Sequence, residues 1–180
     1  MTSIKRDPLL AIAKGILWFL MGIMALSAAA CLLTAPIAFF MRDHIMADLL
    51  KDAPDLAVQQ FVDALAAICV LAAALLAVLF RIFHLLKQIV DTVGDGDPFV
   101  PENARRLTRM AWLTLAVQLI SLPLGGLALW IGNVIKGGGS GPHVDAGFDA
   151  NGLLLMLILF ILARVFRKGA EMRAELEGTV

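Results

Sequence analysis

The sequence predicts an all-α integral membrane protein, an antiparallel four-helix bundle with its N and C termini in the cytoplasm. Hydrophobic residues make up 60% of the 180 positions and charged residues 17%, whereas soluble domains have about 45–50% and about 25%. The apolar residues stand in four long runs, and most basic residues stand at the two ends of the chain and around the connection between the second and third runs. A helix rises about 1.5 Å per residue, so about 20 residues cross a bilayer core of about 30 Å. We therefore expect a single membrane domain over residues 1–180.

The first span is expected at about residues 12–41. Asp7-Pro8 is a favourable helix start, because aspartate caps a first turn and proline fits its first position. A cleaved signal peptide also has an apolar stretch after basic residues, but that stretch is only about 7–15 residues long. The run 15–41 is longer, which favours an uncleaved anchor. Pro36 is expected to bend or end the helix.

The second and third spans are expected at about residues 61–84 and 109–135, joined by a cytoplasmic loop at 85–108. The spacing of apolar residues beyond the second span predicts that its helix continues until Gly94 stops it. Pro101-Glu102 is typical of a first helical turn, so the third helix is expected to begin inside this loop. Pro123 is expected to bend the third helix.

The fourth span is expected at about residues 150–167, with Asp149 as its N-cap. A cytoplasmic helical extension is expected at 168–180, because the sequence turns polar there without a helix breaker. Opposite charges four residues apart stabilise a helix. Two such ion pairs are predicted, Arg167 with Glu171 and Arg173 with Glu177.

The basic residues indicate the orientation. Twelve of the fifteen lie in the N-terminal tail, in the central loop with its flanks, and in the C-terminal end. Only Arg42, Lys51 and Lys136 lie in the other two connections. Lys and Arg are enriched in the short cytoplasmic loops of membrane proteins. We therefore expect four spans with cytoplasmic termini, in the bacterial cytoplasmic (inner) membrane.

Two stretches carry a family resemblance: Gly96-Asp-Pro-Phe-Val-Pro-Glu-Asn-Ala-Arg-Arg-Leu107 and the end of the chain from Phe166 to Val180. In both, and essentially throughout, the chain resembles a bacterial family of small four-span membrane proteins that has only a domain-of-unknown-function label. Its members are often encoded beside a Cro/CI-type helix-turn-helix regulator. The resemblance implies a functional link to such a regulator and defines no catalytic residues. Gly178 departs from the family pattern, in which a larger residue is more common.

The resemblance and the polar loop together lead to one functional hypothesis. We expect a non-enzymatic regulatory or sensory membrane protein whose partner is a cytosolic helix-turn-helix regulator. Phe99 would be an exposed apolar anchor, and the alternative is a turn with Phe99 folded onto the bundle and arginines that only set the topology. The expected partner-binding residues are Phe99, Glu102, Asn103, Arg105, Arg106, Arg173 and Glu175.

A small oligomeric transporter or channel is the alternative function. Gly125, Ala128 and Gly132 fall on one face of the third helix, and small residues allow close helix packing. A homo-oligomer is therefore a further expectation. Polar residues in the spans, Asp63, Gln118, Ser121 and Asn133, could line a solute path, although helix capping and interhelical hydrogen bonds are the simpler interpretation.

The sequence contains no motif of a hydrolase, a metalloprotease or a nucleotide-binding enzyme. We expect no enzyme activity, no cofactor and no metal site. The formal net charge is zero, which argues against direct binding of nucleic acid. Cys31 and Cys69 could form a redox pair at similar depth, but membrane cysteines usually act as small apolar residues. His44 and His143 could sense pH or bind a metal together, although the sequence offers no clear third ligand.

Overall fold

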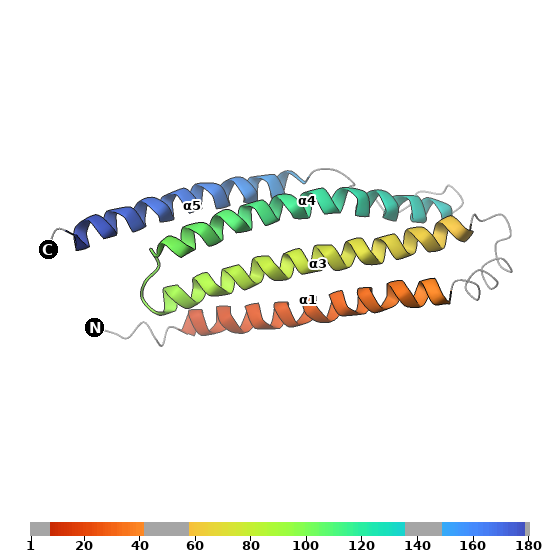
Figure 1. Ribbon diagram of the computed structural model, residues 1–180, viewed down its shortest axis with the longest axis horizontal. Coiled ribbons are helices and arrows are strands. Elements are labelled where there is room, and N and C mark those ends of the chain that lie inside the picture. Colours follow the sequence, from red (N-terminus) through yellow and green to blue (C-terminus); the bar gives the residue numbers. More distant parts are fainter. Residues whose placement is uncertain (1–7, 42–57, 136–148, 179–180) are drawn as a thin grey trace. The chain divides into compact units, whose positions relative to one another are not determined.

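Four long helices make up the computed structural model, which describes residues 8–41, 58–135 and 149–178 (Figure 1). They are α1 (Pro8–Phe40), α3 (Val58–Gly94), α4 (Pro101–Ile135) and α5 (Ala150–Glu177). No strand occurs in these three ranges. His44, His143 and the basic residues Lys5, Arg6, Arg42, Lys51 and Lys136 lie outside the described residues.

The first two helices begin and end near the predicted signals. α1 starts at Pro8 and continues through Pro36 to Phe40, so Pro36 does not end the helix at its own position. α3 extends well past the predicted span and stops at Gly94, as expected. Just after it, Gly96 has a positive φ of 87°, a backbone conformation that glycine adopts without strain.

The last two helices confirm the predicted caps. α4 begins at Pro101 with Glu102 in its first turn and runs without a break through Pro123. The Asp149 carboxylate accepts a hydrogen bond of 3.0 Å from the Asn151 backbone N–H and so caps α5. α5 continues to Glu177, so the predicted extension of the fourth span is helical.

All four helices are long and apolar enough to cross a membrane. Many of their large apolar side chains are exposed rather than packed against the protein, among them Trp18, Phe19 and Leu26 on α1. A bilayer would cover such surfaces, since contiguous exposed apolar surface is unfavourable in water. The chain is therefore a multi-pass membrane protein with an all-helical fold.

The chain divides into two compact units, each assembled from separate segments. Unit 1 comprises residues 1–24, 78–117 and 149–180, and unit 2 comprises 25–77 and 118–148. The core of unit 1 is apolar and is contributed by α3, α4 and α5. Its buried members are Leu85, Ile89, Leu107, Met110, Ala111, Leu159 and Ala163.

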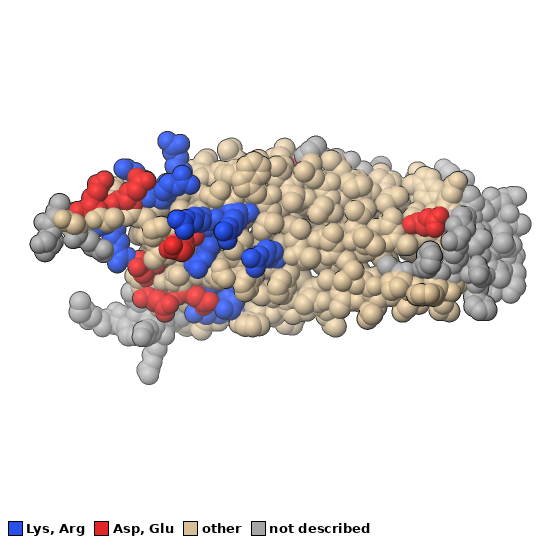
Figure 2. Space-filling view, in the orientation of Figure 1, with Lys and Arg blue, Asp and Glu red and all other residues tan. Residues whose placement is uncertain are grey.

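Every Lys and Arg that the structure describes belongs to unit 1. Figure 2 shows these basic side chains gathered around the end of unit 1 that holds the α3–α4 loop. In the described part of unit 2, Asp63 is the one charged side chain, and it is exposed at the start of α3. The uneven distribution of basic residues along the sequence therefore corresponds to the division into two units, since the described basic residues are all in unit 1.

Unit 2 contains the predicted helix-packing face of α4. Gly125 is buried, and Ala128 and Gly132 are half-buried. Cys31 and Cys69 also lie in this unit, and both are free, half-buried thiols.

Candidate partner-binding site at the α3–α4 loop

The short loop between α3 and α4 is organised around the side chain of Asn103. This side chain is fully buried, and its amide group donates hydrogen bonds to Thr92 Oγ1 (2.7 Å) and to the Pro98 carbonyl oxygen (2.9 Å). The Thr92 hydroxyl in turn donates to the Ile89 carbonyl oxygen at 2.8 Å. Asn103 thus connects the end of α3, the loop and the start of α4.

Arg106 completes this network from the next turn of α4. Its Nη1 donates to Asn103 Oδ1 at 2.7 Å and to the Gln88 carbonyl oxygen at 3.4 Å. A buried polar side chain costs free energy unless its donors and acceptors are paired. The polar groups of Asn103 are paired inside the chain, so Asn103 and Arg106 hold the loop in its conformation.

Phe99, at the outer side of the loop, packs on α5. Its ring lies 5.4 Å from that of Phe166 between centroids, with the planes inclined by 44°. The α5 backbone comes close to the same ring, because a Cβ added to Gly169 would lie 2.6 Å from Phe99 Cδ1. Phe99 nevertheless remains 42% exposed. We call the contact of Phe99 with Phe166 and Gly169 the aromatic latch.

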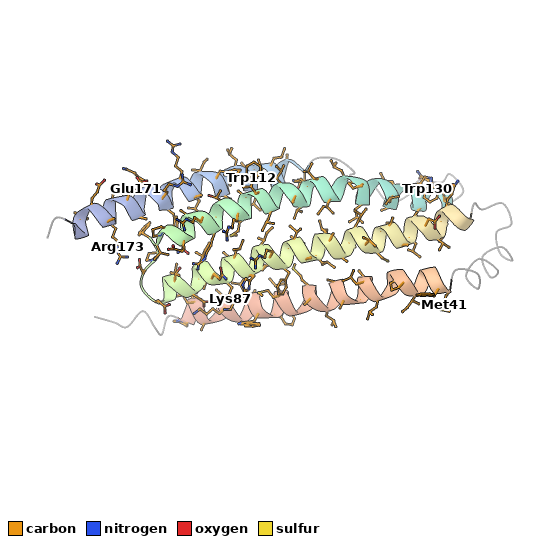
Figure 3. All side chains as sticks on the ribbon, in the orientation of Figure 1. Met41, Lys87, Trp112, Trp130, Glu171 and Arg173 are labelled. Carbon is orange, nitrogen blue, oxygen red and sulfur yellow. The ribbon has the colours of Figure 1, made fainter. Side chains whose placement is uncertain are left out.

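One ion pair joins the same two elements. Arg173 on α5 is paired with Asp97 in the loop, and Figure 3 shows the Arg173 side chain extending from α5 toward the loop. The predicted pair of Arg167 with Glu171 is replaced. Glu171 pairs with Lys168 at 3.4 Å instead of Arg167, and Arg173 reaches a carboxylate 76 positions away. The side chain of Glu177 lies outside the described residues.

The remaining predicted partner-binding residues are exposed. Glu102 and Arg105 form a loose pair at 3.8 Å on the surface of the first turn of α4, and Glu175 is exposed on α5. With the half-exposed ring of Phe99 and the Arg173–Asp97 pair, they form a mixed surface over the loop and the end of α5. We call it the loop surface.

The sequence interpretation missed a second connection in unit 1, between α1 and α3. Asp91 accepts from Lys14 at 2.8 Å and from Lys87 at 2.9 Å. Lys87 also lies 5.5 Å from the centre of the Trp18 ring. The sequence contained two signals of this connection. Lys14 is the single basic residue within the long apolar part of α1, and Lys87 and Asp91 are spaced i,i+4 and can form an ion pair on one helix. Similarly, the glycine at position 169 of α5 indicated that another part of the chain packs closely against this helix.

In the described ranges, no three His, Cys, Asp or Glu side chains lie close enough together to hold a metal ion. Asp97 of the loop is paired with Arg173 of α5, and Glu102 is loosely paired with Arg105 on α4. The arrangement provides a rigid framework beneath a polar and partly aromatic surface. Such a surface can bind another protein, since exposed aromatic groups and arginines are common at protein interfaces.

Comparison with known proteins gives one family. The family described as Protein of unknown function (DUF2975) matches residues 44–180, from just after α1 to the last residue. The match includes the α3–α4 loop, α4 and α5, which contribute the residues of the loop surface. No curated protein and no solved structure is similar to the chain.

Proposed function

The chain belongs to the family described as Protein of unknown function (DUF2975), and from this premise we propose that it is a regulatory membrane protein without enzyme activity. Its partner in this proposal is a cytosolic helix-turn-helix regulator, which docks on the loop surface. The membrane is the bacterial cytoplasmic membrane, with the α3–α4 loop and both termini on the cytoplasmic side.

The observation that carries the proposal is the construction of the loop surface. Phe99 keeps 42% of its surface exposed on a loop that the buried Asn103 holds in one conformation. Exposed charges of both signs lie on the two helices next to the loop, at Glu102 and Arg105 of α4 and at Glu175 of α5. A partly exposed aromatic group on a rigid support, within a polar rim, is the arrangement expected of a protein-binding site.

The orientation is supported by the distribution of basic residues. All ten Lys and Arg side chains that the structure describes belong to unit 1. Short cytoplasmic connections are enriched in these residues. In this orientation the loop surface faces the compartment in which a DNA-binding protein works.

A solute path receives less support than a regulatory role. The core of unit 1 is built from Leu, Ile, Met and Ala side chains. Across the described residues, the buried polar side chains are Asn103, Thr114 and Gln118. Asn103 belongs to the loop, and the Thr114 hydroxyl donates to the Met110 carbonyl oxygen of its own helix at 2.9 Å. A transporter or channel would need a continuous series of polar groups through the bundle.

The test is affinity purification of the protein from native membranes in mild detergent, followed by mass spectrometry of the bound proteins. The variant is Glu102→Ala with Arg105→Ala, which removes an exposed i,i+3 pair from the loop surface. The matched control is Lys168→Ala with Glu171→Ala, an exposed i,i+3 pair on α5. Neither change touches the Asn103 network, so both variants should insert and fold.

We expect a small helix-turn-helix protein to copurify with the wild type and with the control, and to be reduced at least severalfold with the loop variant. Equal recovery from both variants would remove the loop surface from the proposal. Recovery of the protein only as a homo-oligomer, without a soluble partner, would contradict the regulatory role. Flux measurements in liposomes would then test the transporter alternative.

A further inference from the structure

A groove in unit 1 lies between α3 and α4, and none of its lining residues belongs to the loop surface. Its volume is about 330 Å³, at the lower end of the range of about 300–1,000 Å³ that is usual for small-molecule sites. Two residues from α3 and three from α4 line it: Arg81, Leu85, Arg109, Trp112 and Leu113. The lining is therefore two guanidinium groups and three apolar side chains, without a carboxylate.

Among the described residues, no carboxylate pairs with the two arginines of this groove. Both are exposed, and neither forms a hydrogen bond or an ion pair with any residue in the part of the chain that the structure describes. Arg106 and Arg173 of the same unit differ, because they are bound to Asn103 and Asp97. Two unneutralised guanidinium groups at one opening attract an anion, and their planar donor geometry matches phosphate oxygens.

The groove also stands at the boundary between apolar and charged surface. From Ala64 to Phe80, α3 carries no charged residue, and Arg81 is the first one after that stretch. Arg109 is the last charged residue of α4 before its apolar part. Trp112 is 60% exposed beside it, and tryptophan is enriched where a bilayer meets water.

We propose that this groove binds the phosphate-bearing headgroup of an anionic phospholipid from the surrounding bilayer. Arg81 and Arg109 hold the phosphate, and Leu85, Leu113 and Trp112 contact the glycerol and the first part of the acyl chains. Basic pockets between membrane helices on the cytoplasmic side are suited to such headgroups. Lipid binding at this position does not depend on the proposed regulator, because it uses different residues.

Trp112 provides a direct probe. A chain with Trp18→Phe and Trp130→Phe retains Trp112 as its single tryptophan and would be reconstituted in nanodiscs of phosphatidylcholine. Brominated phosphatidylglycerol or brominated phosphatidylcholine would then be titrated in as a quencher of Trp112 fluorescence. We expect half-maximal quenching at a mole fraction roughly tenfold lower for phosphatidylglycerol, since each basic residue near an anionic surface strengthens binding substantially.

The charge dependence identifies the site. Arg81→Gln with Arg109→Gln should abolish the preference for phosphatidylglycerol. The control Arg105→Gln with Arg167→Gln removes two basic residues of unit 1 that do not line the groove and should retain the preference. Equal quenching by both lipids, or a preference that survives the Arg81 and Arg109 changes, would overturn the proposal.

A second measurement covers the case in which the single-tryptophan chain does not fold. Native mass spectrometry of the chain with all three tryptophans, released from detergent, should retain phosphatidylglycerol adducts that withstand collisional activation. The Arg81→Gln, Arg109→Gln variant should lose these adducts while its phosphatidylcholine adducts stay unchanged. Inorganic phosphate at millimolar concentration should leave the lipid adducts in place. Their displacement would assign the groove to a soluble phosphate instead.

Discussion

Gly169→Ala tests the aromatic latch, because two opposing effects act at this position and only one of them involves Phe99. Alanine in a helix is favoured over glycine by about 1 kcal/mol. However, the new Cβ would lie 2.6 Å from Phe99 Cδ1 and 3.0 Å from Cε1, so the ring or the helix has to move. Overpacking of this kind costs about 1–3 kcal/mol. In the wild-type chain, we therefore expect α5 to be destabilised by about 0–2 kcal/mol.

The same substitution should have the opposite effect without the ring. In a Phe99→Ala background the steric cost disappears, and Gly169→Ala should stabilise α5 by up to about 1 kcal/mol. The difference between the two backgrounds is the coupling energy of the double-mutant cycle, expected at about 1–3 kcal/mol.

The assay is hydrogen exchange of the α5 amides beyond residue 169 in detergent micelles, because exchange reports the free energy of local opening. Exchange of amides in the middle of α3 serves as the internal control and should not change. If Gly169→Ala has the same effect in both backgrounds, Phe99 does not hold α5 and the aromatic latch is refuted.

Three further predictions concern the hydrogen bonds and ion pairs of unit 1. Asn103→Ala should lower the stability by about 1–3 kcal/mol, because it leaves buried polar groups unpaired, and thermal unfolding in detergent would measure this; an unchanged midpoint would contradict it. Arg173→Gln should weaken the docking of α5 by at most about 1 kcal/mol, since the pair with Asp97 is exposed, and limited proteolysis should find no difference from wild type at high salt. Lys14→Met should also lower the free energy of unfolding by at most about 1 kcal/mol, because Asp91 keeps its ion pair with Lys87. A larger loss in thermal unfolding would show that the Lys14–Asp91 pair contributes more than an exposed ion pair.

The helix boundaries could be predicted because their causes are local. Proline at positions 8 and 101, the Asp149 cap and the glycines after α3 act within one turn of the residues that they affect. The membrane location follows from the length and composition of the same helices. None of these inferences requires knowledge of which helices touch.

The interior of the candidate site could not be predicted, because it depends on contacts between distant positions. Nothing near Phe99 in the sequence indicates that it faces Gly169. Arg173 pairs with Asp97, 76 positions away in the sequence, and only the packing of α5 brings the two close. Asparagine is usually exposed, so the sequence gives no sign that Asn103 is buried. Its burial depends on Thr92 and Pro98, which both accept hydrogen bonds from its amide group.

The Asn103 network also has a consequence for the order of events during synthesis. All of its members lie between Gln88 and Arg106, so the turn can close before α5 has been made. Chains grow at about 5–20 residues per second, and several seconds pass between the addition of Arg106 and that of Arg173. The last helix therefore arrives at a turn that is already complete, and it docks there as a separate, final step.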